Sequence, residues 1–290
     1  MRRIIVIFLL GLTSLVLAQQ SPNAPYTPFY FLKFGDYLFE KNDYLRAATE
    51  YERFLFFQKP DTFPRVYYKV GLSYYRLEAY SRAKHFFATA LSKGPSATLQ
   101  DSLQLGLTAI TLRTEPQPNP DQILNTPSGS GFSTVSLRCR LYAALAALKN
   151  SNYRRALSLI PDQALSDSSD TQYGFFRVKK LAQKGLHLPH KAPWKAALLS
   201  SIIPGSGKFY TENRGDGLYS FLLVVGTGLL SYRGYKRGDP FQTYFFGASA
   251  IFFYTGNIYG SYLSAKLFNR KTKENLLHEI QDEIHYWTNL

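Results

Sequence analysis

The sequence predicts an all-α protein, in which a solenoid of helical hairpins is followed by a transmembrane helical hairpin. Three observations lead to this prediction. A pattern of small, aromatic and basic residues around Gly35 recurs around Gly71. Two long apolar segments alternate with glycine-rich turns between Trp194 and Phe268. The chain also opens with a short apolar run, and its 290 residues suffice for one soluble domain plus a membrane module.

Residues 1–18 have the features of a secretory signal peptide. Arg2 and Arg3 precede an apolar run from Ile4 to Leu17, and the small residue Ala18 comes next. A basic start, a short apolar stretch and a small residue at the cleavage point define such a signal. The run, of roughly 14 residues, is short for a spanning helix. We expect cleavage after Ala18 and export of the rest of the chain, with an uncleaved anchor as the alternative.

Charge and cysteine content restrict the possible partners. The formal net charge is +14, and Cys139 is the only cysteine, which excludes an intrachain disulfide and a cysteine-rich metal site. In an exported protein we expect no nucleic-acid partner. The positive charge fits anionic lipid headgroups or acidic envelope polymers. The alternative is that lysines and arginines are simply scattered over solvated helix faces.

Residues 19–188 are predicted to form the helical repeat domain. Each repeat carries a small residue in its first helix and another in its second, and a proline follows each of the first two repeats. The small residues are Gly35 with Ala47, Gly71 with Ala83, and Ala144 with Ala156, and the prolines are Pro60 and Pro95. Small residues allow two helices to approach closely, and proline ends the second helix. Such hairpins must stack to bury their apolar faces.

These small, aromatic and proline positions resemble those of the tetratricopeptide repeat, closely over 29–97 and loosely over 137–168. The resemblance implies a concave face, built from the first helices, that binds a peptide or an envelope protein. Its positions correspond here to Leu32, Asp36 and Phe39 in the first repeat, and to Arg65, Tyr68, Leu72, Tyr75 and Arg76 in the second. The arginines and tyrosines could hold an acidic or aromatic peptide. Alternatively, the tyrosines pack on the next helix or on the membrane module.

The segment 114–133 interrupts the repeats. It is rich in proline, serine and glycine, a composition that buries too little apolar surface to order itself. We expect a flexible insertion there.

Residues 189–268 are predicted to form the membrane module. The apolar stretch 194–203 is short, which favours an interfacial helix, whereas the segments at about 217–235 and 241–263 are predicted to be transmembrane helices. The basic turn between them, Arg233 to Arg237, favours a cytoplasmic location for this loop. The cytoplasmic loop and the signal peptide together predict a protein of the bacterial inner membrane, with its repeat domain in the periplasm.

The module has a glycine-rich motif of its own. Its residues are Pro204, Gly205, Gly207, Lys208, Tyr210, Asp216, Gly217, Gly256, Asn257 and Gly260. Over 192–270 the chain resembles small bacterial membrane modules of the Pro-Gly-x-Gly-(Gln/Lys)-x-Tyr type, found in TM2-like and related uncharacterised families. The resemblance implies an architecture and no particular chemistry. Gly256 and Gly260 give a small-residue face that should pack against the other half of the hairpin, or else form a homo-oligomer, and Asn257 should find a hydrogen bond within the bundle.

No cofactor and no metal site is predicted. Gly205 to Lys208 differs from a phosphate-binding loop, because Phe209 replaces the required Ser or Thr. Residues 269–290 are predicted to form an amphipathic C-terminal helix, with Leu277, Ile280, Ile284 and Trp287 on its apolar side. The polar side carries His278, Asp282 and His285, which we interpret as surface residues and not as metal ligands.

The sequence contains no recognisable catalytic residues. The favoured interpretation is therefore a non-enzymatic scaffold or assembly factor of the bacterial envelope, bound to the lipid bilayer and presenting a protein-interaction surface. Two alternatives remain open. One is an outer-membrane-associated component, and the other is an envelope-polymer-modifying enzyme with an unrecognised site.

Overall fold

The computed structural model describes residues 27–58, 63–125, 133–161 and 170–289, and all of their regular structure is helical. The all-α prediction is confirmed for these ranges. The predicted signal peptide, residues 1–18, lies outside them. The chain divides into two compact units, of which the first comprises residues 1–116, 120–142 and 288–290, and the second residues 117–119 and 143–287.

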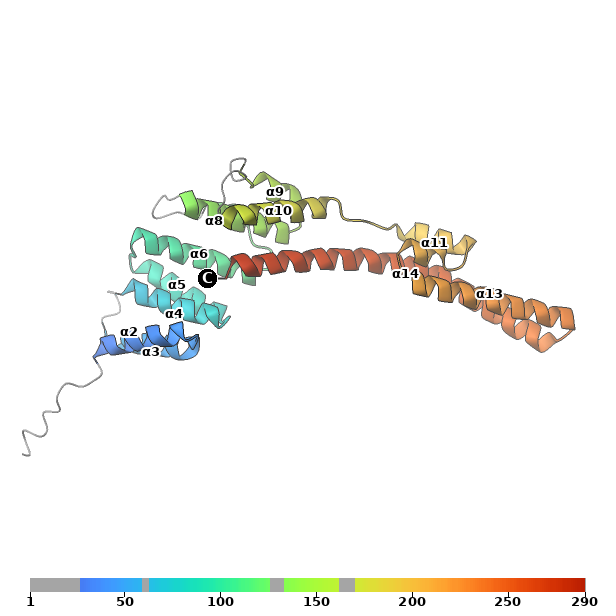
Figure 1. Cartoon of the computed structure of the whole chain (residues 1–290), viewed down its shortest axis with the longest axis horizontal. Coiled ribbons are helices and arrows are strands. Elements are labelled where there is room, and N and C mark those ends of the chain that lie inside the picture. The colour runs from blue at the N-terminus through green and yellow to red at the C-terminus, as the bar shows by residue number, and fades with distance from the viewer. Residues whose placement is uncertain (1–26, 59–62, 126–132, 162–169, 290) are drawn as a thin grey trace, which may run out of the picture. The chain divides into compact units, whose positions relative to one another are not determined.

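In the first unit, the helices between residues 28 and 114 are antiparallel, and each packs on the next (Figure 1). Its helices are α2 (Pro28–Glu40), α3 (Tyr44–Phe57), α4 (Pro64–Arg76), α5 (Tyr80–Ser92), α6 (Ala97–Thr114) and α7 (Pro120–Leu124), with the beginning of α8 (Ser133–Lys149). Proline occupies the start of α2 and of α4, where its missing N–H leaves no helical hydrogen bond unmade.

Glycines allow the aromatic core of this unit to form. A Cβ on Gly35 would lie 2.7 Å from the Tyr51 ring. Gly71 and Gly106 contact opposite edges of the Phe87 ring, where an added Cβ would lie 2.5 and 2.7 Å from ring carbons. Tyr51 and Phe87 are both almost completely buried. The small residues therefore create the space for large rings between neighbouring helices, as the repeat pattern predicts.

The turn inside each hairpin has the same geometry. Asn42, Glu78 and Ser151 all have left-handed backbones, with φ of 61°, 58° and 58°. The residue after each donates a hydrogen bond to the carbonyl five positions earlier, at 2.9, 2.9 and 2.8 Å. This is the Schellman arrangement that ends helices. The turns of α2–α3, α4–α5 and α8–α9 are therefore three copies of one structure.

Asp36 links the first hairpin to the second. Its Oδ1 accepts hydrogen bonds from the Tyr51 hydroxyl at 2.7 Å and from Lys69 Nζ at 2.5 Å. The sequence predicts that this residue lines the binding face, and the structure gives it a packing role between α2, α3 and α4. Burial, together with the adjacent Asp36 carboxylate, raises the pKa of Tyr51.

The second unit contains the end of α8 and six further helices. These are α9 (Tyr153–Ser158), α10 (Asp170–Leu186), α11 (Pro193–Ile202), α12 (Ser206–Tyr210), α13 (Arg214–Arg237) and α14 (Pro240–Trp287). Helices α13 and α14 form an antiparallel hairpin (Figure 1). Helix α11 packs on α14 at the end of this hairpin that lies away from the α13–α14 turn (Figure 1). Further along, α14 packs on α10, where Arg177 bonds Glu283 and Lys184 bonds Glu279, both at 2.5 Å.

Two parts of the chain differ from the sequence prediction. The helices predicted at 241–263 and 269–290 are one continuous helix, α14, because residues 264–272 contain neither proline nor glycine. Its buried apolar face consists of Leu276, Ile280 and Ile284, so Leu276 takes the place predicted for Leu277. Within the predicted flexible insertion 114–133, Pro120–Leu124 forms α7 and Ile123 is buried.

The predicted membrane segments are helical. The interfacial helix 194–203 corresponds to α11, and the predicted spans 217–235 and 241–263 lie in α13 and in the first half of α14. Among the helices of the described ranges, none is both long and apolar enough to cross a bilayer. The helical hairpin is therefore confirmed, and its transmembrane character stays a prediction.

Candidate functional site

The five residues predicted to bind a partner all lie on α4. They are Arg65, Tyr68, Leu72, Tyr75 and Arg76, and their spacing places them along one side of the helix. Arg65 and Arg76 are exposed, whereas Tyr68 and Leu72 are half-buried. Tyr68 stacks on Phe87 with ring centroids 5.7 Å apart, so this tyrosine packs on α5 as the alternative interpretation proposes.

Tyr75 and Arg76 bind residues from the far end of the same chain. The Tyr75 hydroxyl donates a hydrogen bond to the main-chain carbonyl of Thr288. Arg76 donates from its guanidinium to Asn289 Oδ1 at 3.1 Å. Tyr75 is only 2% exposed and Thr288 is fully buried, so the contact lies inside the first unit, to which residues 288–290 belong.

Arg113, in the last turn of α6, completes this contact. Its Nε donates to Thr288 Oγ1 at 2.7 Å, and its NH1 donates to the Tyr80 hydroxyl at 2.7 Å. The guanidinium also lies 5.3 Å from the Tyr75 ring centroid and 5.8 Å from that of Tyr80. We define Tyr75, Arg76, Tyr80 and Arg113 as the α4–α6 groove. Sequence reasoning missed Arg113, because α6 lies outside the two repeats with a recognisable pattern. It also missed Tyr80, because this residue begins α5, whereas the resemblance implies a face built from the first helices.

The groove favours protonated tyrosine. Burial raises the pKa of the Tyr75 phenol, although the neighbouring Arg113 charge partly opposes this effect. Burial also raises the pKa of Tyr68, again opposed by a guanidinium, that of Arg76. The Tyr75 hydroxyl therefore keeps its proton at neutral pH and acts as a hydrogen-bond donor.

In the second unit, the Pro-Gly-x-Gly motif forms a buried polar cluster. The Asn257 side chain accepts a hydrogen bond from Gly205 N at 3.0 Å and donates to the Ser200 carbonyl at 3.3 Å. The Ser200 hydroxyl bonds Ser261 Oγ at 2.7 Å and accepts from Gly207 N at 2.9 Å. We call Ser200, Gly205, Gly207, Asn257 and Ser261 the polar cluster. It fastens the α11–α12 turn to α14.

The local geometry requires glycine at both glycine positions of the Pro-Gly-x-Gly segment, Gly205 and Gly207. Gly205 has φ of +87°, and an added Cβ would lie 2.1 Å from the Gly217 carbonyl oxygen. At Gly207 an added Cβ would lie 1.9 Å from the Ala196 carbonyl oxygen. Gly217 in turn packs under the Phe209 ring. The motif is therefore explained by close backbone packing.

The other motif residues have separate environments. Lys208 Nζ donates to Ser220 Oγ at 2.7 Å and lies beside Gly260, whereas a Cβ on Gly256 would meet open space. The Tyr210 hydroxyl accepts from Ala192 N at 3.2 Å, and Asp216 accepts from Asn213 at 2.7 Å. Pro204 is half-buried beside the cluster. The structure does not bring Gly256 and Asp216 into the polar cluster, and the expected homo-oligomer through Gly256 and Gly260 stays a prediction.

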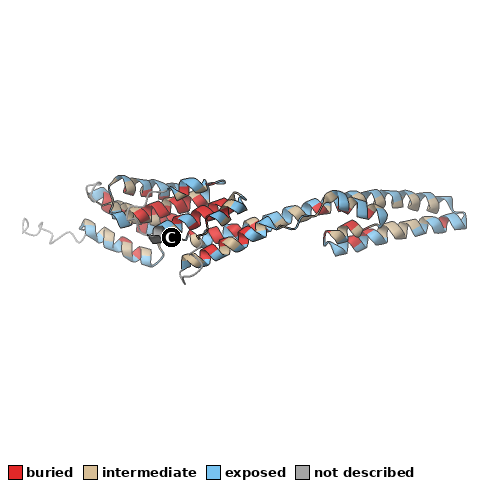
Figure 2. Ribbon diagram, turned by 90° about the horizontal axis from the view of Figure 1, so that it is seen from above, coloured by how far each residue is buried: buried red, intermediate tan, exposed pale blue. Residues whose placement is uncertain are grey.

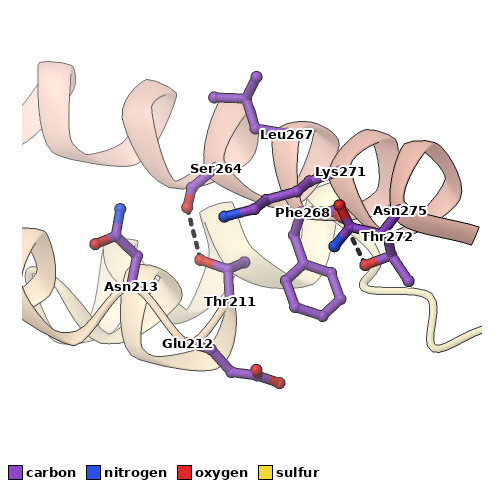
Figure 3. Close-up of a pocket in the computed structure, with 9 residues that line it drawn as sticks. All are labelled: Thr211, Glu212, Asn213, Ser264, Leu267, Phe268, Lys271, Thr272 and Asn275. Carbon is purple, nitrogen blue, oxygen red and sulfur yellow. Dashed lines mark hydrogen bonds between the residues drawn. The ribbon is translucent and has the colours of Figure 1, made fainter. Parts of the chain in front are cut away.

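A surface cleft of about 580 Å³ lies between the α12–α13 turn and α14 (Figure 3). It is lined by Thr211, Glu212, Asn213, Ser264, Leu267, Phe268, Lys271, Thr272 and Asn275. The hydroxyls of Thr211 and Ser264 bond each other at 2.7 Å, as the dashed line in Figure 3 shows. Glu212 forms an ion pair with Lys191 at 3.4 Å. The first contact holds the turn on α14, and the second joins it to the segment before α11.

Within the described ranges, no group of three or more His, Cys, Asp or Glu side chains is arranged to hold a metal ion. His278, Asp282 and His285 are exposed on α14.

No protein-family model, no curated protein and no solved structure matches the chain. Both family resemblances therefore stay predictions.

Proposed function

We propose that this chain is a non-enzymatic scaffold or assembly factor of the bacterial envelope. Its tetratricopeptide-like hairpins present a docking face for an envelope protein, and its α11–α14 module holds the chain in a lipid bilayer. The observation that carries the proposal is the inverted polarity of this module.

The module buries polar and small groups and exposes apolar ones. Between Pro193 and Asn275 the only buried apolar side chains are Ala196 and Ala265, whereas Ser200, Thr211, Ser220, Asn257 and Ser261 are all buried. Large apolar side chains lie on the outside, where Ile202 is 71%, Leu229 is 63% and Phe252 is 73% exposed. Figure 2 shows how little of the α13–α14 hairpin is buried.

Such a surface needs an apolar environment. Soluble proteins seldom expose a continuous apolar surface of this extent, because its contact with water costs about 25 cal/mol per Å². In lipid the same surface is favourable, and the hydrogen bonds of the polar cluster satisfy the groups that lipid cannot. Bundles in lipid also pack through small residues, as Gly205, Gly207 and Gly217 do here.

Aromatic and basic residues suit the headgroup region. Lys195 lies over the Trp194 ring at 5.5 Å and Lys236 over Tyr232 at 5.2 Å. Tryptophan, tyrosine and snorkelling lysine favour the interface between acyl chains and water. Arg233 and Arg237 at the hairpin tip add positive charge for anionic lipids. These residues favour lipid over a protein partner as the occupant of the hairpin surface.

The membrane part is tested by flotation of the purified full chain with phosphatidylglycerol-containing vesicles. The wild-type protein is expected to float. Leu222→Glu, Leu229→Glu and Phe252→Glu combined should abolish flotation, because these exposed positions would then carry carboxylates, whose transfer into lipid is unfavourable. The matched control places the same three charges at exposed apolar residues of the first unit, Leu45, Phe56 and Leu77, and should float. Equal behaviour of both triple variants would contradict lipid binding by the hairpin.

The inner-membrane topology is tested with single cysteines. Cys139 is the only natural cysteine, so Cys139→Ala provides a background. In cells with a permeabilised outer membrane, an impermeant maleimide should label Lys84→Cys in the repeat domain and spare Arg237→Cys at the hairpin tip. Labelling of both positions, or of Arg237→Cys alone, would refute the proposed placement.

The docking face is tested by photocrosslinking from Arg65, which is exposed on α4. A single envelope protein should be captured in cells. The control position is Lys84, exposed on α5. The same products from both positions would contradict a specific face on α4.

A further inference from the structure

We infer that the α4–α6 groove binds a partner segment carrying a hydroxyl residue followed by an acidic residue, and that Thr288 and Asn289 occupy this site as a neutral internal substitute. This inference names the ligand and the regulation of the docking face, and so rests on the proposed function.

The groove presents donors and its occupant presents acceptors. The Tyr75 hydroxyl, the Arg113 Nε and the Arg76 NH1 each donate. They meet, in order, a main-chain carbonyl, a hydroxyl oxygen and a carboxamide oxygen of residues 288–289. A main-chain contact is open to any peptide, whereas the two side-chain contacts select for oxygen acceptors at consecutive positions. This is a pattern of peptide recognition.

The charges of groove and occupant do not match. Arg76 brings a guanidinium, whereas the Asn289 side chain that it bonds is neutral. Among the described residues, Arg76 makes no ion pair, and its bond to Asn289 lies at the exposed edge of the groove. A carboxylate in the place of the Asn289 carboxamide would form a charge-assisted hydrogen bond, which is roughly twice as strong as a neutral one. An acidic segment is therefore the better ligand.

The internal segment competes with such a ligand. Thr288 is fully buried against Tyr75 and Arg113, so no second segment can make the same contacts while it is bound. The apparent affinity for a partner falls by the fraction of molecules whose groove is open. The neutral segment 288–289 therefore fills the groove when no ligand is present, and an acidic partner segment displaces it.

The inference is tested by fluorescence anisotropy on the full chain in detergent. The probe is a labelled peptide amide of sequence Tyr-Trp-Thr-Asp, and the comparison peptide ends in Thr-Asn. The Thr-Asp peptide should bind about tenfold more tightly, as one charge-assisted bond replaces a neutral one. Arg76→Ala should abolish this preference. Lys84→Ala removes one positive charge from α5 and is the matched control, which should keep it.

Two substitutions of the occupant should act in opposite directions. Thr288→Ala with Asn289→Ala weakens the internal contact and should raise the affinity for the Thr-Asp peptide about tenfold or more. Asn289→Asp strengthens the internal contact and should lower that affinity by a similar factor. Unchanged affinity in both variants, or a preference that survives Arg76→Ala, would overturn the inference.

The outcome is separable from the proposed function. If vesicle flotation and crosslinking from Arg65 succeed while the peptide measurements fail, the scaffold proposal stands and the acidic-segment inference falls. If the hairpin does not bind vesicles, the membrane proposal falls, and the peptide measurements still decide the inference.

Discussion

The hydroxyl of Tyr75 bonds the main-chain carbonyl of Thr288, 213 positions further along the chain. The sequence predicts that Tyr75 holds an incoming peptide, and the peptide it holds in the structure belongs to its own chain. The contact is buried and polar, and a guanidinium lies over the Tyr75 ring. Such contacts favour one arrangement of the chain, because a buried polar group that loses its partner cannot form a hydrogen bond to water instead.

Replacing Tyr75 with Phe should release the segment at 288–289. The substitution keeps the ring and removes the donor, leaving a buried carbonyl without its hydrogen bond at a local cost of about 1–3 kcal/mol. We expect faster amide hydrogen exchange at residues 288–289, by about five- to 150-fold. Tyr67→Phe, on α4 but outside the groove, is the control. Equal exchange in the two variants would argue against a stabilising role for the Tyr75 hydroxyl.

The glycines of the α11–α14 module should differ sharply in their tolerance of alanine. Gly207→Ala places a Cβ against the Ala196 carbonyl and should lower stability by about 3 kcal/mol or more through overpacking. Gly256→Ala meets open space on a helix and should raise stability by up to about 1 kcal/mol. Thermal unfolding in detergent, followed by circular dichroism, measures both. A destabilising Gly256→Ala would indicate a close neighbour at that position, such as a second copy.

Asn257→Leu should disrupt the polar cluster while keeping side-chain volume. The Gly205 N–H and the Ser200 carbonyl lose their partners in a buried site, which should cost about 2–4 kcal/mol in total. Thr255→Val, on an exposed side of the same helix, is the control and should change stability by less than about 0.5 kcal/mol. The same unfolding measurement applies, and a neutral Asn257→Leu would show that the cluster does not hold the turn.

Replacing Glu78, in the α4–α5 turn, with glycine should raise the stability of the protein. Glu78 has φ of 58°, and a left-handed backbone costs a residue with a Cβ about 1–2 kcal/mol. Glycine removes this strain but loses about 0.5–1 kcal/mol of conformational entropy. We expect Glu78→Gly to stabilise the protein by about 0.5–1 kcal/mol in urea unfolding. Glu78→Ala keeps the strain and should show no gain, and similar gains in both variants would contradict the explanation.

Alkaline pH should destabilise the first unit through Tyr142. Burial raises the pKa of this phenol to about 12, from an unfolded value of 10.0. The folded state therefore favours the neutral phenol, and this contribution is complete below pH 10 and is lost as the pH rises towards 12. The slope is about 1.4 kcal/mol per pH unit. Urea unfolding between about pH 9 and 11.5 should show this slope reduced in Tyr142→Phe. An unchanged slope would mean that other groups dominate.

The hairpins could be anticipated from sequence because their requirements are local. Gly35 and Gly71 stand where a ring must fit, and the same left-handed turn follows each first helix. Asn257 makes the hydrogen bonds within the bundle that its polar side chain predicts. The roles of Arg113 and Thr288 could not be anticipated, because they depend on which distant segments meet. The length of α14 escaped prediction for a different reason, since an apolar and a charged half can form one helix when nothing interrupts them.

Helix α14 uses two faces far apart along its length. Asn257 and Ser261 face the α11–α12 turn, while Leu276, Ile280 and Ile284 form its buried apolar face beyond residue 275. Each residue of a helix turns the following ones by about 100°. One residue inserted after Lys271 would therefore rotate the second face out of phase with the first, whereas seven would restore the phase to within about 20°. The stretch between these faces is thus limited in length by angle, even though most of its own side chains are exposed.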